Sequence, residues 1–502
     1  LQDEWTATPN FSLNLGVRFD DPIFFTKPPA NPLVQQQFGI NTADIPSGNV
    51  QFSPRFGFNW NVTGDDRNQV RGGVGMFQSS PAYVWMSNSF QNSGGVSGFA
   101  NLNCNNPAAA PAFTSAAVSS PPTACRTSIT AAAGSEVDYA NPNLKFPQVL
   151  RGNLAYDRDL GNGYVATFEG LYTKAINSLF YYNLALVDTP VGTGVDGRTL
   201  YGLQTNKPSL KVATRNTVYD VVNKSQDYSY SLTGQLQKRF TRNLGGSVAY
   251  TRTQAYSIQD LTSSTAGSQY RFGRTYSVGQ LETPLAHSAF ETPNRIVGDV
   301  SYTLPTKTSL SVIYQGQSGI HFTYISSNDL NGDNQTLNDP VYIPTGPSDP
   351  KGPVFATAAF GVTPAQQATA FDDYISSNSC LNSQRGQIMK RNSCDSPWMN
   401  EFDVSAEQAL TTIRGQNISL RLDVFNVGNL LNKNWGRQIT TGNFSPVTLY
   451  SASGISLPGG AAGAADLTTG VPKVTFDPKF NPFTYNNIFS NYSMQLSFRY
   501  SF

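Results

Sequence analysis

Apolar and polar residues alternate along several long segments of the chain. In residues 491–502 every second position is apolar, and the positions between them are Asn, Ser, Gln or Arg. The same alternation occurs in segments 11–20, 52–62, 228–240 and 418–424. A period of two residues predicts β-strands with one apolar and one polar face. Most of these segments exceed the usual strand of about five or six residues and match the roughly 9–11 tilted residues that cross a bilayer.

The connections between the predicted strands alternate between short and long. Short turns lie at 6–10, 63–68, 159–163, 241–245, 304–307 and 412–416. Long polar stretches lie at 21–50, 79–145, 185–226, 257–290, 326–397 and 428–489. Outer-membrane barrels have this asymmetry, with short periplasmic turns and long extracellular loops. We therefore predict an all-β fold, a transmembrane antiparallel up-and-down β-barrel with its long loops facing the cell exterior.

The physics of the bilayer favours this fold over a soluble one. In hydrocarbon every backbone N–H and C=O must be paired internally, so strands span a membrane as closed barrels. The apolar face of each strand then meets lipid, and charges of both signs, such as Arg71 and Glu169, line a wet lumen. The alternative, a soluble β-sandwich or propeller, predicts shorter strands and short loops at both ends.

The number of predicted strands is odd. The pattern places thirteen strands at about 1–6, 11–20, 51–62, 68–78, 146–158, 164–184, 227–240, 246–257, 291–304, 308–325, 398–410, 416–427 and 490–502. Bacterial single-chain barrels have an even number of strands. We therefore expect residues 1–502 to be the carboxy-terminal part of a larger barrel, with an odd number of strands upstream.

Composition and charge exclude several classes of protein. Charged residues make up 13% of the chain, about half the usual share of roughly 25%. The net charge of +1 gives no electrostatic reason to expect nucleic acid as a partner. Neither His287 nor His321 belongs to a recognisable catalytic motif, so we do not expect an enzyme. Two histidines and no CxxC spacing also argue against a zinc site.

Four cysteines lie in the polar stretches. Pairing of nearest neighbours gives two disulfides, Cys104–Cys125 and Cys380–Cys394, in an oxidising compartment. The sequence is compatible with three connectivities, and four free thiols are the alternative.

One polar loop carries a pattern of oxygen ligands. Asp329, Asn331 and Asp333 alternate in DLNGDNQTLND, and Asp339 follows. Alternating carboxylate and amide oxygens suit a hard cation such as Ca²⁺. The segment departs from an EF-hand because Gly332 stands at the fourth position. The alternative is an Asx-rich turn without an ion; apart from this calcium, no cofactor is expected.

Two further loop segments have recognisable features. Residues 363–380 predict a short helix with Thr363 as cap and Gln366 completing a capping box. Residues 82–94 gather aromatic side chains, which favour an outer aromatic girdle over an exposed binding patch.

Several blocks of the chain resemble the carboxy-terminal barrel of TonB-dependent outer-membrane receptors, and among them the Oar-like group. The blocks are QDEWTATPNFSLNLGVRFD, FSPRFGFNWNVTGDDRNQVRGGVGMF, YVWMSNSFQNSG, DLNGDNQTLNDPVYIP, RLDVFNVGNLLNKNWG and the terminal SFRYSF. The resemblance implies a barrel of about 22 strands with a plugged lumen. It also implies that the plug and the amino-terminal domains, which carry coupling to the inner-membrane TonB complex, are absent from this chain.

The resemblance also gives the last strand a role. A final strand that ends in Phe resembles the signal read by the barrel-assembly machinery, and the matching residues are Leu496, Phe498, Tyr500 and Phe502. The alternative is a lipid-facing strand whose one task is to remove an open sheet edge.

The resemblance implies an outer-membrane transport barrel of a Gram-negative bacterium. It would take up a bulky or scarce extracellular ligand whose identity the sequence does not encode. A surface adhesin or secretion-associated barrel is the second hypothesis, and a passive porin is the third.

Overall fold

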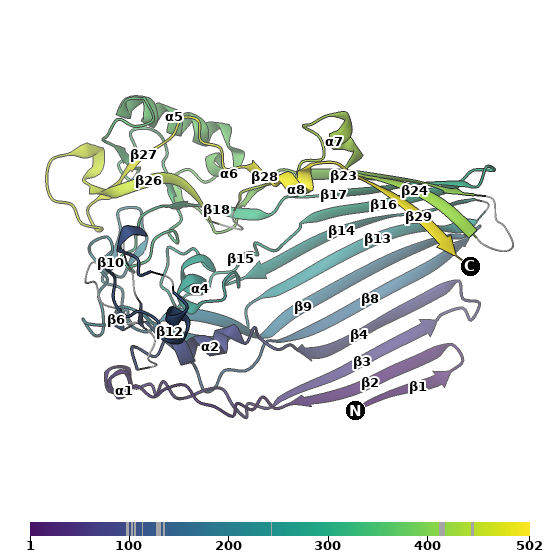
Figure 1. Ribbon diagram of the computed structural model, residues 1–502, viewed down its shortest axis with the longest axis horizontal. Helices are drawn as coiled ribbons and strands as arrows, with labels where there is room; N and C mark the ends of the chain where they lie inside the picture. The colour runs from purple at the N-terminus through teal and green to yellow at the C-terminus, as the bar shows by residue number, and fades with distance from the viewer. Residues whose placement is uncertain are drawn as a thin grey trace.

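The computed structural model describes most of the chain. The described residues are 1–96, 100–101, 104, 107–112, 114–126, 132–133, 136–241, 243–410, 417–442 and 446–501. Antiparallel strands form one large curved sheet, and the long connections gather at one end of it (Figure 1). None of the described helices is long and apolar enough to cross a membrane.

The main path of the sheet follows the order of the sequence. Within the described residues, thirteen strands lie along it, each antiparallel to the next. They are β1 (Gln2–Thr8), β2 (Phe11–Asp20), β3 (Gln51–Asn61), β4 (Asn68–Gln78), β8 (Gln148–Gly161), β9 (Tyr164–Asn183), β13 (Tyr228–Thr241), β14 (Leu244–Ser257), β16 (Asn294–Thr303), β17 (Thr308–Gln317), β23 (Met399–Ala409), β24 (Asn417–Phe425) and β29 (Ser493–Ser501). In the described part of the chain, β1 pairs only with β2 and β29 only with β24, so the sheet is open at both edges.

The two faces of these strands differ in chemistry, as the alternation predicts. Leu154 of β8, Phe168 of β9 and Leu232 of β13 are 59%, 63% and 61% exposed. Contiguous exposed apolar side chains of this size on a soluble protein would be anomalous. They are expected where a strand faces lipid.

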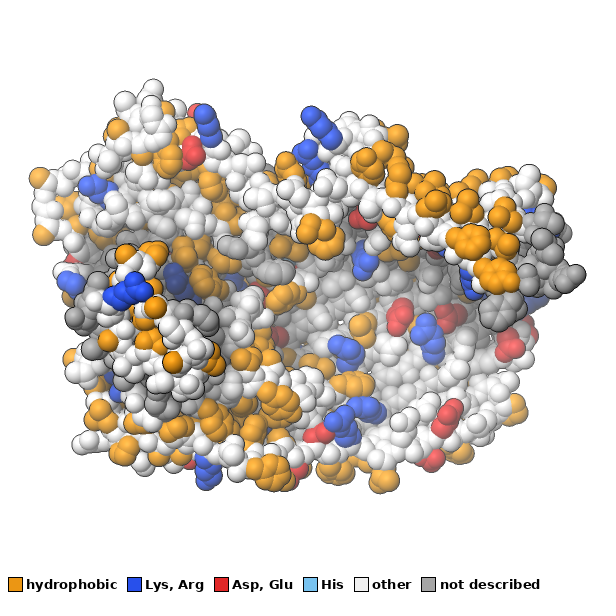
Figure 2. All heavy atoms as spheres, in the orientation of Figure 1, with side chains coloured by type: hydrophobic (Ala, Val, Ile, Leu, Met, Phe, Trp, Pro, Cys, Tyr) orange, Lys and Arg blue, Asp and Glu red, His pale blue; other side chains and the backbone are white. Residues whose placement is uncertain are grey.

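The opposite face is polar. Arg71 reaches Asp157 at 3.0 Å and Glu169 at 3.8 Å across three neighbouring strands. Figure 2 shows Lys, Arg, Asp and Glu side chains distributed over the hollowed side of the sheet. The predicted charges of both signs are therefore present on the face that lines the hollow, and three of them pair across neighbouring strands.

The long connections pack into folded structure, and we call them the loop assembly. It comprises the described residues of 21–50, 79–147, 184–227, 258–293, 318–398 and 426–492. One core forms where α2 (Val84–Gln91) and α4 (Ala266–Phe272) cover β12 (Val218–Lys224), which lies between β9 and β7 (Val137–Ala140). A second core lies between α5 (Pro364–Ser377) and a sheet ordered β20 (Val354–Phe355), β27 (Val471–Thr475), β26 (Pro446–Ser456), β18 (His321–Ser326) and β22 (Cys394–Asp395).

Shorter elements complete the loop assembly. They are α1 (Pro32–Phe38), β5 (Ala100–Asn101), η1 (Pro107–Ala109), α3 (Ala116–Ser119), β6 (Ala132–Ala133), β10 (Gly192–Thr193), β11 (Thr199–Leu200), β15 (Ala286–His287), β19 (Tyr342–Ile343), α6 (Ser379–Asn382), β21 (Gln387–Ile388), α7 (Val427–Leu431), β25 (Ile439–Thr440), η2 (Pro458–Gly460), β28 (Thr484–Tyr485) and α8 (Asn487–Ser490).

The structure corrects two sequence predictions. The strand predicted over 308–325 is two elements, because β17 ends at Gln317 and β18 leaves the main sheet to pair with β22 and β26. Gly319, between them, lies so close to the Ser396 carbonyl that a Cβ atom would overlap it. The aromatic segment 82–94 contains helix α2, which packs into the first core instead of forming a girdle: Met86 is buried and Trp85 Nε1 donates to the Ser263 carbonyl at 2.9 Å.

The predicted capped helix is confirmed. In α5 the Thr363 side chain accepts from the Gln366 N–H, and Gln366 accepts in return from the Thr363 N–H at 2.9 Å. Phe371 and Ile375 on its inner face are buried in the second core.

Candidate functional site

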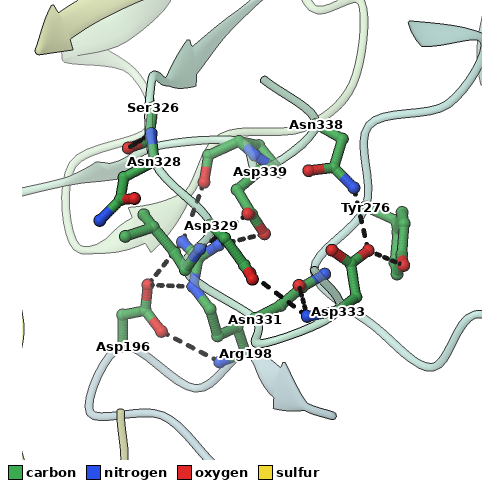
Figure 3. A network of polar contacts seen from close by, with 12 residues as sticks. Asp196, Arg198, Tyr276, Ser326, Asn328, Asp329, Asn331, Asp333, Asn338 and Asp339 are labelled. Carbon is green, nitrogen blue, oxygen red and sulfur yellow. Dashed lines mark hydrogen bonds and ion pairs between the residues drawn. The ribbon is translucent and has the colours of Figure 1, made fainter. Parts of the chain in front are cut away.

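The loop between β18 and β19 folds around its own aspartates (Figure 3). Asp329 Oδ1 accepts from the Gly332 N–H at 2.6 Å, and Oδ2 accepts from the Asn334 N–H at 3.0 Å. Gly332 and Asn334 have φ of 72° and 69°, the left-handed region that these residue types tolerate. The close spacing of polar residues in this segment therefore produces a tight turn that wraps one carboxylate.

The neighbouring carboxylates point into the same buried region. Asp333 accepts from the Gln335 N–H at 2.8 Å, from Asn338 Nδ2 at 3.0 Å and from the hydroxyl of Tyr276. Asn331 Oδ1 accepts from the Asp333 N–H at 2.9 Å.

Asp339 completes the group of four residues that the sequence singled out. It accepts from the Leu330 N–H at 2.8 Å and from Arg198 Nη1 at 3.1 Å. The structure thus brings Asp329, Asn331, Asp333 and Asp339 together in one buried region (Figure 3). We call these four residues, together with Asp196 and Arg198, the carboxylate cluster.

Arg198 and Asp196 come from a distant part of the chain. Arg198 donates to Asp196 Oδ2 through Nη2 at 2.7 Å and Nε at 2.9 Å, and to the Pro340 carbonyl at 2.9 Å. Its side chain is 2% exposed. Sequence reasoning missed both residues, because a contact between the 196–198 turn and the 329–340 loop leaves no local signal.

The cluster holds more carboxyl groups than cations. Asp196 and Asp339 pair with Arg198, and the carboxyl groups of Asp329, Asp333 and Asp339 are 0% exposed. Burial raises the pKa of Asp329 to about 7, helped by the nearby Asp333, and burial also raises the pKa of Asp333 and of Asp339. Within the described residues, Asn338 Oδ1 is buried without a hydrogen-bond donor. Carboxylates and a free amide oxygen are the donor set that a hard cation prefers.

The cysteines pair as nearest neighbours. Cys104 is bonded to Cys125, and Cys380 is bonded to Cys394. The second disulfide joins α6 to β22 beside the second core.

A cavity of about 450 Å³ lies beside the cluster. Its wall includes Tyr256, Tyr276, His287, Met389 and Arg391. Tyr276 is shared with the cluster, because its hydroxyl donates to Asp333. In the part of the chain that the structure describes, Arg391 Nη1 has no hydrogen-bond partner. The cavity is mostly apolar, and Arg274, Lys390 and Arg391 lie along its wall. An apolar cavity with a few polar groups is typical of a small-molecule site.

The last strand has the predicted pattern. Leu496, Phe498 and Tyr500 of β29 are 70%, 69% and 46% exposed on one face. They pair in register with Leu422, Leu420 and Ile418 of β24. Phe502, the last residue of the proposed assembly signal, lies outside the described residues.

Residues 1–455 match the family described as outer membrane beta barrel domain. The chain belongs to this family. It is therefore an outer-membrane protein, in agreement with the apolar outer face and polar inner face of its sheet. No curated protein matches the chain.

Solved structures similar to this chain include an outer-membrane transporter and two receptors. The transporter YddB from Escherichia coli is 10% identical with a TM-score of 0.43, covering 93% of this chain and 42% of its own. A variant of the ferric enterobactin receptor PfeA from Pseudomonas aeruginosa is 11% identical with a TM-score of 0.42, covering 99% and 44%. The siderophore receptor PiuA from Acinetobacter baumannii is 8% identical with a TM-score of 0.40, covering 100% and 42%. The chain thus spans less than half the length of each of these structures.

Proposed function

We propose that this chain is the carboxy-terminal part of the barrel of a TonB-dependent outer-membrane transporter, which binds a scarce or bulky ligand with its loop assembly. The observation that carries the proposal is the folded loop assembly at one end of a polar-lined sheet. Its described residues form the two hydrophobic cores above and two smaller ones, with a disulfide beside the second core and a cavity. Ordered loops of this extent suit selective capture, whereas a passive porin requires an unobstructed lumen.

The open edges of the sheet support a larger barrel. β1 and β29 each leave a row of backbone donors and acceptors unpaired in the described residues. Such groups are costly in hydrocarbon. In this proposal further strands pair with both edges of the sheet, and a plug fills the lumen and couples the barrel to the inner-membrane TonB complex. The loop assembly faces the cell exterior. Strand β29 presents the signal for the barrel-assembly machinery.

The cavity would be the first ligand contact. Its volume falls within the usual range of roughly 300–1,000 Å³ for small-molecule sites. The positive charge of Arg391 in the wall would attract an anionic group of the ligand, while Tyr256 and Met389 would contact its apolar part. The expected ligand is therefore an amphipathic molecule with a carboxylate or a similar anionic group.

The carboxylate cluster would hold one Ca²⁺ as a structural ion of the loop assembly. A divalent cation would compensate the buried negative charge that Arg198 alone leaves unbalanced. Calcium at a hundred times its dissociation constant should stabilise the folded assembly by about 2.7 kcal/mol.

Thermal unfolding of the full-length protein in detergent, with calcium or with EGTA, measures this gain in stability. Asp333→Asn should abolish the gain, while Asp372→Asn in α5 should leave it intact. Equal unfolding temperatures with calcium and EGTA in the wild-type protein contradict this part of the proposal.

Transport is tested in the host bacterium. Compounds depleted from the culture medium are compared between the wild type, a deletion of this gene and a strain without TonB. The proposal expects one compound to remain in the medium in both mutants, and its uptake to fall in Arg391→Gln but not in Arg385→Gln, a loop arginine outside the cavity. Depletion that needs the gene but not TonB indicates a porin. Unchanged depletion together with loss of surface attachment indicates an adhesin, and either result refutes the proposal.

A further inference from the structure

The two histidines of the chain lie side by side, although they come from different connections. The ring centroids of His287 and His321 are 4.5 Å apart. The carboxylate of Glu291 reaches both rings. Its Oε2 is 2.8 Å from His287 Nδ1, and its Oε1 is 3.4 Å from His321 Nε2.

Ordered backbone positions these three side chains. His287 lies in β15 and pairs with Tyr256 of β14. His321 begins β18 and pairs with Asp395 of β22. Glu291 is fixed because its Oε2 accepts from the Ala255 N–H at 2.8 Å. The donors therefore converge from three separately held segments, which is the preorganisation that a metal site requires.

Two of the converging atoms lack hydrogen bonds. Among the described residues, Glu291 Oε1 and His321 Nε2 are buried and make no hydrogen bond to any other group; their one polar contact is with each other, at 3.4 Å. The side chains of Glu291 and His321 are 0% and 8% exposed. Buried polar atoms without partners are costly and uncommon, so this pair of facing atoms calls for a ligand between them.

The distances and the donor types fit a transition metal. Two ligand atoms bound about 2.0–2.1 Å from a tetrahedral zinc ion lie roughly 3.4 Å apart, and His321 Nε2 and Glu291 Oε1 are separated by 3.4 Å. The candidate ligand atoms of His287, Glu291 and His321 all lie within 4.8 Å of one another. Two imidazoles and a carboxylate are an established ligand set for zinc.

Asp395 adds the supporting contact that such sites have. It bonds to Nδ1 of His321, which leaves Nε2 to face Glu291. A carboxylate on the far nitrogen of a ligating imidazole fixes the tautomer and the ring orientation. This arrangement distinguishes His321 from a histidine that is merely packed in a loop.

We propose that His287, Glu291 and His321 bind one divalent transition-metal ion of the zinc type, with Asp395 as the positioning residue for His321. The ion joins β15 and the segment before β16 to β18 and β22. Since Cys394 precedes Asp395, the disulfide to α6 is connected to the same point. The metal therefore clamps the second core of the loop assembly to the main sheet at the wall of the cavity. This inference is independent of the transported ligand.

A proton is the alternative occupant. Burial lowers the pKa of His321, but Asp395 and Glu291 raise it more strongly, to about 9. A protonated imidazole between two carboxylates would give the same contacts without a metal. Direct metal binding separates the two accounts.

The test uses the full-length protein in detergent micelles, stripped with a chelator and titrated calorimetrically with ZnCl₂ in excess calcium, which occupies sites for hard cations. One zinc ion should bind per chain, and Co²⁺ in its place should give the visible absorption of a nitrogen- and oxygen-ligated ion. Glu291→Gln and His321→Ala should lose stoichiometric binding. Asp395→Asn should weaken binding about 10- to 100-fold, while Asp372→Asn should bind as the wild type does.

Glu291→Gln and His321→Ala change buried side chains, so His287→Ala is the variant most expected to fold. The His287 side chain is 32% exposed, and its loss is the easiest to tolerate. Its fold is checked by circular dichroism and by resistance of the loops to trypsin. Loss of zinc binding in folded His287→Ala supports the site. The proposal is overturned if the folded wild type binds no zinc at micromolar concentrations, or if folded His287→Ala retains wild-type affinity.

Discussion

Replacing Arg198 by methionine should increase the frequency of local unfolding in the loop assembly. The increase should be far larger than for the replacement of a partly exposed arginine. The guanidinium is 2% exposed and makes hydrogen bonds to Asp196, Asp339 and the Pro340 carbonyl. Methionine fills a similar volume with a flexible apolar chain, so the substitution removes charge and hydrogen bonds without leaving a large cavity.

The free-energy cost of this substitution follows from the buried carboxyl groups that Arg198 leaves without a partner. Without Arg198, the carboxylate of Asp339 stays buried next to Asp329 and Asp333 with no cation. Breaking a buried ion pair by removing one partner costs about 3–5 kcal/mol. Since about 1.4 kcal/mol is a factor of ten, amides protected by this packing should exchange roughly 100- to 4,000-fold faster.

Hydrogen exchange followed by mass spectrometry measures this effect on peptides that cover β18 and β26. The full-length protein is used in detergent with EGTA, so that calcium does not compensate the lost charge. Arg385→Met is the control for a less buried arginine. Its pair with Asp372 is 19% and 27% exposed at 2.9 Å, and Arg385 also donates to the Pro344 carbonyl and to Ser376. Its loss should cost less than that of Arg198, because water can reach the groups left behind. Acceleration below tenfold in Arg198→Met, or equal to the control, would refute the reasoning.

Three further substitutions test other parts of the loop assembly. Phe371→Ala should destabilise the second core by about 3–5 kcal/mol, because its 2% exposed ring packs 5.2 Å from the Phe476 ring; unchanged exchange in α5 would contradict this packing. Replacing Cys380 and Cys394 by alanine should cost about 3 kcal/mol for a sequence separation of 14, seen as faster tryptic cleavage of the 379–395 segment, and cleavage at the wild-type rate would argue against it. Burial raises the pKa of Asp220 to about 7, so the native state holds this proton more tightly than the unfolded chain does, and stability should fall as pH rises from about 4 to about 7. Asp220→Asn should remove that part of the slope in exchange measurements at several pH values, and a slope identical to the wild type would refute the assignment.

The strands of the main sheet were accessible to sequence reasoning because their signal is local. In β13, Leu232 faces outward and the adjacent Thr233 faces the opposite side, where its hydroxyl meets that of Thr251 at 2.9 Å. A period of two is enough to predict both faces. The continuous pattern over 308–325 predicted one strand, which was wrong. The chain turns at Gly319 beside Ser396, a residue far along the chain.

Part of the carboxylate cluster could be predicted from the sequence. The spacing of Asp329, Asn331 and Asp333 is a local property, and the structure brings their side chains together. Arg198 and Tyr276 reach the cluster from other loops, and no spacing in the sequence relates them to it.

The histidine pair shows the same limit. His287 and Glu291 stand four residues apart, which alone could have suggested a shared site. The third member, His321, is brought in by the pairing of β18 with β22. Spacing rules for zinc ligands describe single motifs, so they do not detect donors that only tertiary structure brings together.

The central claim is that one face of each strand in the main sheet contacts lipid. Spin labels at positions 232 and 233 test it directly, since these neighbours lie in β13, the central strand of the main path, away from both open edges. In the full-length protein reconstituted in bilayers, the label replacing Leu232 should be relaxed by oxygen dissolved in the lipid and shielded from a water-soluble nickel chelate. The label replacing Thr233 should show the reverse. Equal access of the nickel chelate to both labels would contradict the account.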